Sequence, residues 1–317
     1  MKDNFGRNIT YLRFSVTDLC NLRCRYCMPE GGVAKLAHSD ILSVEEIGEI
    51  VAAAASLGVT KVRLTGGEPL VRRGILDICR LVSAVPGITE TCLTTNGTLL
   101  REFAAPLRAA GISRLNISLD TLDADRYREI TRGGELAVAL DGVAAAREAG
   151  FDYLKINAVL IGDGGVAPDE EIRALVELTR SPGTHVRFIE LMPIGEMSDW
   201  SRSRYVENSA VLRAVPELAE HDTDGVARVY RLPGAPGAVG LISPVSSHFC
   251  PSCNRIRVTA DGKLKPCLHS PEEINLRGLH GDALTDALRA GILAKPERHH
   301  IDSGASGSRR NMNAIGG

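Results

Sequence analysis

The sequence contains no apolar run that approaches the roughly 18 residues needed to span a bilayer. Its first residues, MKDNFGRNIT, have no apolar core of the kind found in signal peptides. Lys and Arg total 37 against 39 Asp and Glu, so no excess of positive charge indicates nucleic-acid binding. No repeat of solenoid or propeller length is present. We therefore expect a cytoplasmic protein that binds neither membranes nor nucleic acid.

Cysteine is the residue type that carries most information. Thiols stay reduced in the cytoplasm, so eight cysteines indicate metal ligands or catalytic groups before disulfides. Cys79 and Cys92 lie in apolar surroundings and are expected to be small core residues. The other six form two groups of three, with the spacings C-x3-C-x2-C and C-x2-C-x13-C: Cys20, Cys24 and Cys27, and Cys250, Cys253 and Cys267.

Short β-rich runs alternate with helical patterns over the first 195 residues. Six strands are predicted, at 11–16, 61–65, 90–95, 114–119, 153–160 and 185–191. Helices are predicted between them, for example after the S-x-x-E capping box of Ser43 and Glu46, and again over 169–180. Six such β–α steps imply a parallel sheet, which is either an incomplete barrel or an open doubly wound sheet.

The pattern within the strands favours the barrel. Parallel strands covered on both faces usually read as continuous apolar runs, but these alternate, as where Arg13 stands between Leu12 and Phe14. The polar face must then line a wet or ligand-filled interior. We predict an α/β fold with a partial (β/α)6 TIM-like barrel over residues 1–220. A smaller C-terminal α+β domain, 221–317, carries the second cysteine group, and its Gly/Ser/Arg-rich end reads by composition as a flexible tail.

The first three cysteines follow the first strand, at the edge where barrel enzymes place their chemistry. Structural zinc takes four ligands, whereas an iron–sulfur cubane held by three thiolates keeps one iron open for a ligand. "TGGEP" (65–69) ends the second strand at the same edge, where its glycines permit close approach and Glu68 can pair with a cation. For the second group, His248 or His269 would also permit a Cys3His zinc site.

Cys20-x3-Cys24-x2-Cys27, with Tyr26 before the last cysteine and GGEP about 40 residues later, resembles the radical S-adenosylmethionine (SAM) superfamily. "TTNG" (94–97) and "ISLD" (117–120) extend the match. "FCPSCNRIRVTADGKLKPCLH" (249–269) and the terminal Ile-Gly-Gly narrow the resemblance to the GTP 3′,8-cyclase family, from about residue 7 to Gly317.

The resemblance implies two [4Fe-4S] clusters, one on each cysteine group, and SAM bound at the first. It implies reductive cleavage of SAM, hydrogen abstraction from C3′ of GTP and attack of that carbon on C8. The product would be 3′,8-cyclo-7,8-dihydro-GTP, in the first step of molybdenum cofactor biosynthesis. SAM contacts would come from Tyr26, Gly67, Glu68, Asn96, Ser118 and Met192. GTP contacts would come from Arg13, Lys61, Arg63, Thr94, Lys155, Arg187, Arg255, Ile256 and Arg257. Catalytic roles would fall on Cys20, Cys24, Cys27, Arg255, Arg257, Gly316 and Gly317.

The residues support a bound anion independently. Arg13, Lys61, Arg63 and Lys155 share the polar faces of neighbouring predicted strands, and burying uncompensated cations is costly. Asp120 is the one obvious carboxylate on those faces, so an internal ion-pair network is the weaker explanation, and a triphosphate suits arginine.

Two alternatives stay open: another radical SAM enzyme with an auxiliary cluster, such as a peptide-maturing oxidoreductase, or a zinc-stabilised nucleotide-binding protein without redox chemistry. Leu19 stands where many relatives carry Arg, which puts loop contacts in doubt. The resemblance also implies an external one-electron donor of the flavodoxin or ferredoxin type. It leaves open a homodimer and a direct hand-off of product to the next enzyme.

Overall fold

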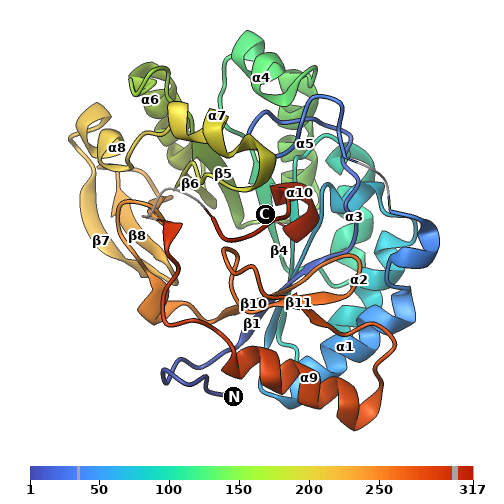
Figure 1. Ribbon diagram of the computed structural model, residues 1–317. Helices are drawn as coiled ribbons and strands as arrows, with labels where there is room; N and C mark the ends of the chain where they lie inside the picture. The colour runs from blue at the N-terminus through green and yellow to red at the C-terminus, as the bar shows by residue number, and fades with distance from the viewer. Residues whose placement is uncertain (34–35, 302–305, 317) are drawn as a thin grey trace.

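A computed structural model describes residues 1–33, 36–301 and 306–316 of the chain. One twelve-stranded sheet organises this part of the molecule, in the order β12-β11-β10-β1-β2-β3-β4-β5-β6-β9-β8-β7 (Figure 1). Its six central strands are those predicted from the sequence: β1 (Tyr11–Ser15), β2 (Lys61–Thr65), β3 (Glu90–Thr95), β4 (Arg114–Ser118), β5 (Leu154–Leu160) and β6 (Thr184–Glu190). They pair in parallel throughout.

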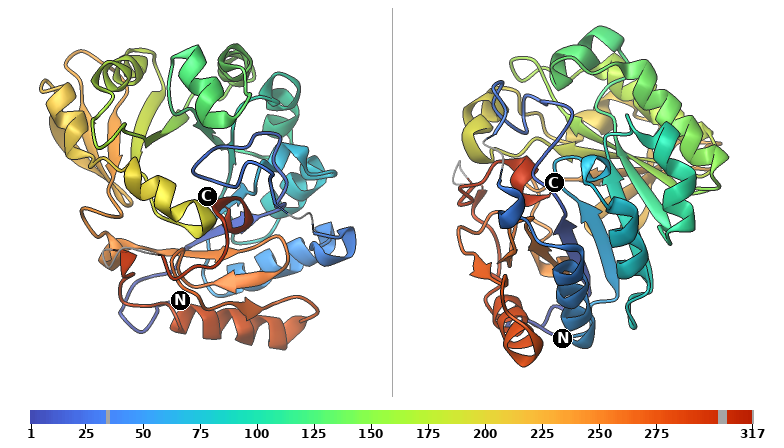
Figure 2. Two further views of the ribbon diagram at one scale, coloured as in Figure 1. Left: turned by 45° about the horizontal axis from the view of Figure 1, so that its top comes forward. Right: turned by 90° about the vertical axis from the view of Figure 1, so that its right-hand side faces the viewer.

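Helices cover the outer face of this curved sheet (Figures 1 and 2). They are α1 (Val44–Ser56), α2 (Ile75–Ser83), α3 (Leu100–Ala109), α4 (Ala124–Thr131), α5 (Leu136–Glu148) and α6 (Asp169–Glu177). The predicted capping box starts α1: the Ser43 side chain accepts the Glu46 N–H, and the Glu46 carboxylate accepts the Ser43 N–H. These helices and the outward side chains of the strands, such as Leu12, Leu64 and Ile117, form the main hydrophobic core.

The C-terminal part of the chain lengthens the same sheet at both ends. On one side lie β9 (Val239–Ile242), β8 (Ala227–Arg231) and β7 (Ala219–Asp224), and on the other β10 (Arg255–Val258), β11 (Lys263–Lys265) and β12 (Ile274–Asn275). β9 and β10 pair in parallel with β6 and β1. The result is a partial barrel with an α+β C-terminal part, as predicted. The sheet is continuous across residue 220, and a domain boundary there stays a prediction.

The remaining helices are α7 (Ser198–Ser203), α8 (Ser209–Ala214), α9 (Gly281–Leu293) and α10 (Met312–Ile315). Helix α9 packs beside α1 and β11, and the chain end enters the middle of the molecule (Figures 1 and 2). Within the described ranges, no helix is long and apolar enough to cross a membrane.

Strand register decides which side chains share the interior. β1 pairs with both β10 and β2, so that Arg13 lies beside Arg257 on one side and Arg63 on the other. Because alternate residues of a strand point to the same face, the three guanidinium groups form a row on the inner surface. The predicted alternation of polar and apolar residues is confirmed here: the apolar neighbours Leu12 and Phe14 are fully buried in the core.

Candidate active site

A cavity of about 460 Å³ lies inside the partial barrel and is lined by all six clustered cysteines. The two groups lie at opposite ends of the strands. Cys20 follows the end of β1, whereas Cys253 precedes the start of β10, which is parallel to β1. At roughly 3.3 Å per residue, strands of this length separate the two groups by on the order of 15 Å. One cavity therefore joins two thiol sites across the row of arginines.

The first thiol site is folded by short local contacts. The Cys27 N–H donates to the Cys24 carbonyl at 2.9 Å, and the Leu22 N–H donates to Cys20 Sγ at 3.4 Å. Burial raises the pKa of Cys20 and Cys24 above the ordinary thiol value and that of Cys27 to about 12, and the neighbouring thiols add to the rise at Cys24 and Cys27. Three adjacent buried thiolates require a cation to offset their charge, as an iron–sulfur cluster does.

The spacing of the thiols also fits a cluster. A single tetrahedral zinc ion holds its sulfur ligands at about 2.3 Å, so the sulfur atoms must lie close together. Among the described residues, neither cysteine group has its three sulfur atoms within 4.8 Å of one another. A cubane places each thiolate on a different iron, which suits this wider spacing.

The GGEP turn packs directly on the cysteine loop. The Gly67 N–H donates to the Thr17 carbonyl at 2.8 Å, and a Cβ at Gly67 would lie 2.3 Å from the Leu19 carbonyl oxygen. Glu68 is buried and accepts hydrogen bonds from the Thr95 hydroxyl at 2.8 Å and the Asn96 N–H at 2.7 Å. Burial raises the pKa of Glu68 to about 7, although these bonds oppose the rise. An ammonium group placed beside it would stabilise the carboxylate.

Tyr26 is held on the same side of the cavity. Its hydroxyl donates to Asp120 Oδ2 at 2.9 Å, and the Val159 N–H donates to Asp120 Oδ1 at 2.8 Å. Burial raises the pKa of Asp120 to about 6. Asn96, Ser118 and Met192 also line the cavity. All six residues predicted to contact SAM are thus brought together on the cavity wall.

The second thiol site has cationic surroundings. Cys250 lies in a 3-10 turn, η5 (Cys250–Ser252), and Cys267 follows β11. Burial by itself would raise the pKa of Cys253, but Lys295 and Arg255 lower it below the ordinary value. The ammonium group of Lys295 is fixed by the carbonyls of Arg255 at 2.8 Å and Pro266 at 3.0 Å. Lys295 and Arg255 therefore favour the anionic thiolate at Cys253, whereas burial raises the pKa of Cys250.

The row of arginines is buried and crowded. Burial lowers the pKa of Arg257 to about 10, and Arg255 adds to the fall. Arg63 donates to the Tyr11 hydroxyl at 2.5 Å and to the Leu93 carbonyl at 3.3 Å. Burial would raise the pKa of Tyr11, but Arg63, Arg13 and Arg255 lower it to about 8. The structure concentrates positive charge here, and a multiply charged anion would offset it.

Several polar atoms of the cavity wall also require a ligand or water. Thr94 Oγ1, Asn157 Oδ1 and Arg255 Nε are buried and have no hydrogen-bond partner among the described protein atoms. Buried polar groups in native proteins are almost always satisfied. The donors and acceptors present therefore fit a polar ligand in this region.

The expectation that carboxylates are scarce around the cations is in part wrong. Glu90 pairs with Lys61 at 2.8 Å. Asp224 pairs with Lys155 at 2.6 Å and also contacts Arg187. Asp224 comes from the β7–β8 hairpin, far along the chain, so inspection of the strand faces did not reveal it. Glu90 also acts on the row of arginines: burial would lower the pKa of Arg63, but Tyr11, Cys92 and Glu90 raise it.

Asn313 and Gly316, near the chain end, make specific contacts inside the molecule, where composition alone indicated a flexible tail. Asn313 is buried, and its side-chain amide donates to the Asp18 carbonyl at 3.0 Å. Arg257 donates to the Gly316 carbonyl, and a Cβ at Gly316 would lie 2.3 Å from Thr65 Oγ1. Gly316 also has a φ of +79°, which side chains rarely adopt. The predicted residue Gly317 lies outside the described residues.

The predicted GTP contacts also meet in this cavity, with one exception. Arg13, Lys61, Arg63, Thr94, Lys155, Arg187, Arg255 and Arg257 line it. Ile256 instead packs in the hydrophobic core and is fully buried there. Sequence reasoning missed Asp224, Lys295, His299, Met312 and Asn313, which also line the cavity. Only Met312 and Asn313 carried a signal, because they lie close before the Ile-Gly-Gly end, separated from it by Ala314.

Comparisons with known proteins agree with this geometry. The family model of the radical SAM superfamily matches residues 14–179, a range that includes Cys20, Cys24 and Cys27, so the fold is that of a radical SAM protein. A model described as Molybdenum Cofactor Synthesis C matches residues 184–301. The GTP 3′,8-cyclases of Alkaliphilus metalliredigens and Alkaliphilus oremlandii are 50% and 47% identical, each over the full length of both chains. The chain belongs to the GTP 3′,8-cyclase family.

A solved structure shares the fold at much lower identity. Streptococcus suis SuiB, crystallised with its precursor peptide SuiA, superposes with a TM-score of 0.57 at 16% identity, covering 97% of this chain and 76% of SuiB. At this identity the likeness shows the fold alone. Radical SAM enzymes use SAM and [4Fe-4S] clusters, and the two three-thiol sites fit two such clusters.

Proposed function

We propose that this protein converts GTP to 3′,8-cyclo-7,8-dihydro-GTP with SAM as co-substrate. The observation that carries the proposal is the pair of three-thiol sites at the two ends of one cavity, with Arg13, Arg63 and Arg257 in register between them. Full-length identity of 50% with a protein named GTP 3′,8-cyclase supports it.

The end of the cavity at Cys20, Cys24 and Cys27 binds and orients SAM. A [4Fe-4S] cluster on these thiolates, when bound, supplies the electron for reductive cleavage of SAM. Glu68, a buried carboxylate with its own hydrogen bonds, offers a fixed acceptor to the amino group of SAM. Asn96, Ser118, Met192 and the Tyr26–Asp120 pair form the surrounding wall.

The other end binds GTP. Cys250, Cys253 and Cys267 hold the second cluster, beside which the guanine base is bound. Arg13, Arg63 and the partly paired Lys61, Lys155 and Arg187 bind the triphosphate. Arginine suits phosphate because its planar fork donates two parallel hydrogen bonds. Arg257 donates to the Gly316 carbonyl and so fixes the chain end against the cavity wall.

The reaction also requires an electron from outside. The hydrogen removed from C3′ leaves as part of 5′-deoxyadenosine, so one further electron and one proton must enter before the nucleotide product is complete. The product is then an isomer of GTP. We propose an external one-electron donor of the flavodoxin or ferredoxin class for both reductions.

The test is a product assay under anaerobic conditions. Reconstituted protein is incubated with SAM, a chemical reductant and GTP, and the mixture is separated and analysed by mass. We expect 5′-deoxyadenosine together with a GTP isomer of changed retention. Cys267→Ala should lose the isomer, whereas Cys79→Ala should retain it, because Cys79 lies on the buried face of α2, in the hydrophobic core. Unchanged GTP in the presence of fully loaded clusters would overturn the proposal.

A further inference from the structure

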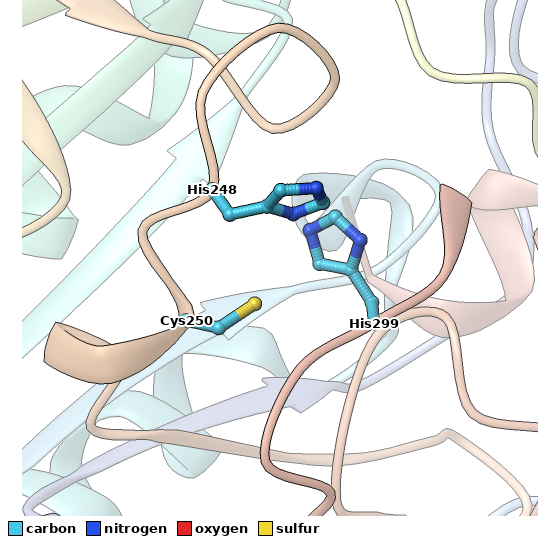
Figure 3. A group of neighbouring side chains, drawn as sticks. All are labelled: His248, Cys250 and His299. Carbon is cyan, nitrogen blue, oxygen red and sulfur yellow. The ribbon is translucent and has the colours of Figure 1, made fainter. Parts of the chain in front are cut away.

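Two histidines lie close to Cys250 of the second thiol site. Together with Cys250 they place three ligand atoms closer to one another than the three thiols of that site are. His248, Cys250 and His299 are oriented toward one another (Figure 3). The two imidazoles and the sulfur each offer one ligand atom, and these three atoms all lie within 4.8 Å of one another. His248 and Cys250 come from the segment between β9 and β10, and His299 comes from the segment after α9.

The three residues are held there by packing. The rings of His248 and His299 lie 4.6 Å apart between centroids, and His269 also packs against His299, at 4.7 Å. Cys250 and His299 are buried, and His248 is partly buried. His269 is itself held by a 3.1 Å contact between Nδ1 and the Ser306 hydroxyl. The group is therefore convergent and largely shielded from water.

The distances between the three ligand atoms indicate which kind of metal centre these residues can hold. A tetrahedral ion holds nitrogen at about 2.0–2.1 Å and sulfur at about 2.3 Å, so its ligand atoms lie close together. Ligands of a cubane sit on different irons and are spread more widely. Among the described residues, this is the one group of three His, Cys, Asp or Glu side chains whose ligand atoms converge within 4.8 Å. Two imidazoles and one thiolate suit zinc, with water as the fourth ligand.

We propose that His248, Cys250 and His299 form a mononuclear zinc site in protein that lacks the second cluster. Cys250 belongs to both arrangements, so zinc and the cluster exclude each other. No histidine lines the cavity near the first thiol site in the part of the chain that the structure describes. Zinc therefore blocks assembly of the second cluster and leaves the first untouched. The exclusion of the cluster rests on the proposed function, whereas the zinc site itself does not.

The first measurement uses the full-length protein freed of iron and sulfide under anaerobic conditions. Cobalt(II) is titrated as a spectroscopic substitute for zinc, followed by competition with zinc. We expect one tight equivalent, with a thiolate-to-cobalt charge-transfer band and the visible bands of a tetrahedral ion. His248→Asn and His299→Asn should each weaken binding by more than the roughly tenfold that loss of even an outer-shell partner costs. His300→Asn, an exposed neighbour, should leave binding unchanged.

The second measurement follows cluster assembly. Protein preloaded with one equivalent of zinc is supplied with iron and sulfide, and iron is counted. The wild type should incorporate half the iron of the zinc-free protein, whereas the double variant His248→Asn/His299→Asn should incorporate the full amount. Iron at the first site reports that each variant is folded.

Two results would overturn the proposal of a zinc site at His248, Cys250 and His299. One is cobalt affinity that is unchanged in both histidine variants but lost in Cys253→Ser and Cys267→Ser, which would assign the metal to the thiols alone. The other is full iron incorporation by zinc-loaded wild type. Failure of the proposed function looks different: cobalt binds as described, yet loaded protein leaves GTP unchanged.

Discussion

The carboxylate of Asp224 lies 2.6 Å from the ammonium group of Lys155 and also contacts the guanidinium of Arg187. Asp224 ends β7 at the tip of the β7–β8 hairpin and is half-exposed, whereas both cations are nearly buried. These are two of the cations to which we assign the GTP triphosphate. Under the proposed function, the Asp224 carboxylate competes with a phosphate oxygen of GTP for these two cations.

Asp224→Asn should raise the affinity for GTP. The substitution removes the anion with which the triphosphate competes, and a half-exposed ion pair of this kind corresponds to about a two- to fivefold change. Equilibrium dialysis of GTP against the reconstituted protein measures it. Asp222→Asn, another exposed carboxylate of the same strand, is the matched control and should have no effect. Weaker binding by Asp224→Asn would show that the carboxylate helps to build the site instead.

GTP affinity should fall as the pH rises through about 8. Burial and Arg187 lower the pKa of Lys155 to about 8, despite the opposing effect of Asp224. Burial would raise the pKa of Tyr11, but neighbouring arginines bring it to about 8 as well. Above this pH, Lys155 loses its positive charge and Tyr11 gains a negative one. Both changes disfavour a triphosphate, by up to about tenfold per pH unit for each group.

A double variant that lacks both titrating groups is the control for this pH profile. Dialysis between about pH 7 and 9 should show the fall in the wild type, and the double variant Lys155→Arg/Tyr11→Phe should bind GTP with nearly constant affinity, because neither new side chain titrates in this range. A wild-type profile that is flat over the same range would contradict the assignment of Lys155 to the binding site.

Gly67→Ala should destroy the first cluster site selectively. The added Cβ would lie 2.3 Å from the Leu19 carbonyl oxygen, so the GGEP turn and the cysteine loop must move apart. Iron content after reconstitution should fall by about half, the second site being unaffected. Gly31→Ala, farther along the same loop, is the control, because a Cβ there meets no atom within 4 Å. Equal iron in both variants would show that the loop tolerates the displacement.

Arg310→Gln should release the chain end. Arg310 makes hydrogen-bonded ion pairs with Asp261 at 2.9 Å and Glu273 at 2.7 Å, and all three side chains are largely buried. Without this anchor, residues 312–316 should exchange backbone hydrogen faster, and GTP cyclisation should fall while both clusters remain loaded. Arg309→Gln, at the exposed adjacent position, should match the wild type. Unchanged exchange in Arg310→Gln would place the anchor elsewhere.

Local pattern was sufficient to predict the six central strands and the row of cations. The alternation around Arg13 required a polar interior, and the structure places that residue there. Local pattern did not predict where β9 and β10 lie in the sheet, because these four-residue strands take their positions from pairing with β6 and β1.

Contacts between distant segments account for the rest of what was missed. "DTDG" around Asp224 predicts only a turn, since its partner Lys155 is 69 residues earlier. His299 lies near Cys250 because the segment that follows α9 returns to the cavity, and no local sequence pattern shows this. The composition of the chain end indicated flexibility. The contacts that Asn313 and Arg310 make are with Asp18 and Asp261, which are distant in the sequence, so composition could not reveal them.

Transfer of deuterium from substrate to cofactor tests the central claim most directly. Protein with both clusters is incubated anaerobically with SAM, reductant and GTP that carries deuterium at C3′ of the ribose. The account predicts 5′-deoxyadenosine that contains deuterium and an equal amount of the cyclised GTP isomer. Unlabelled 5′-deoxyadenosine, or labelled 5′-deoxyadenosine without the isomer, would contradict it.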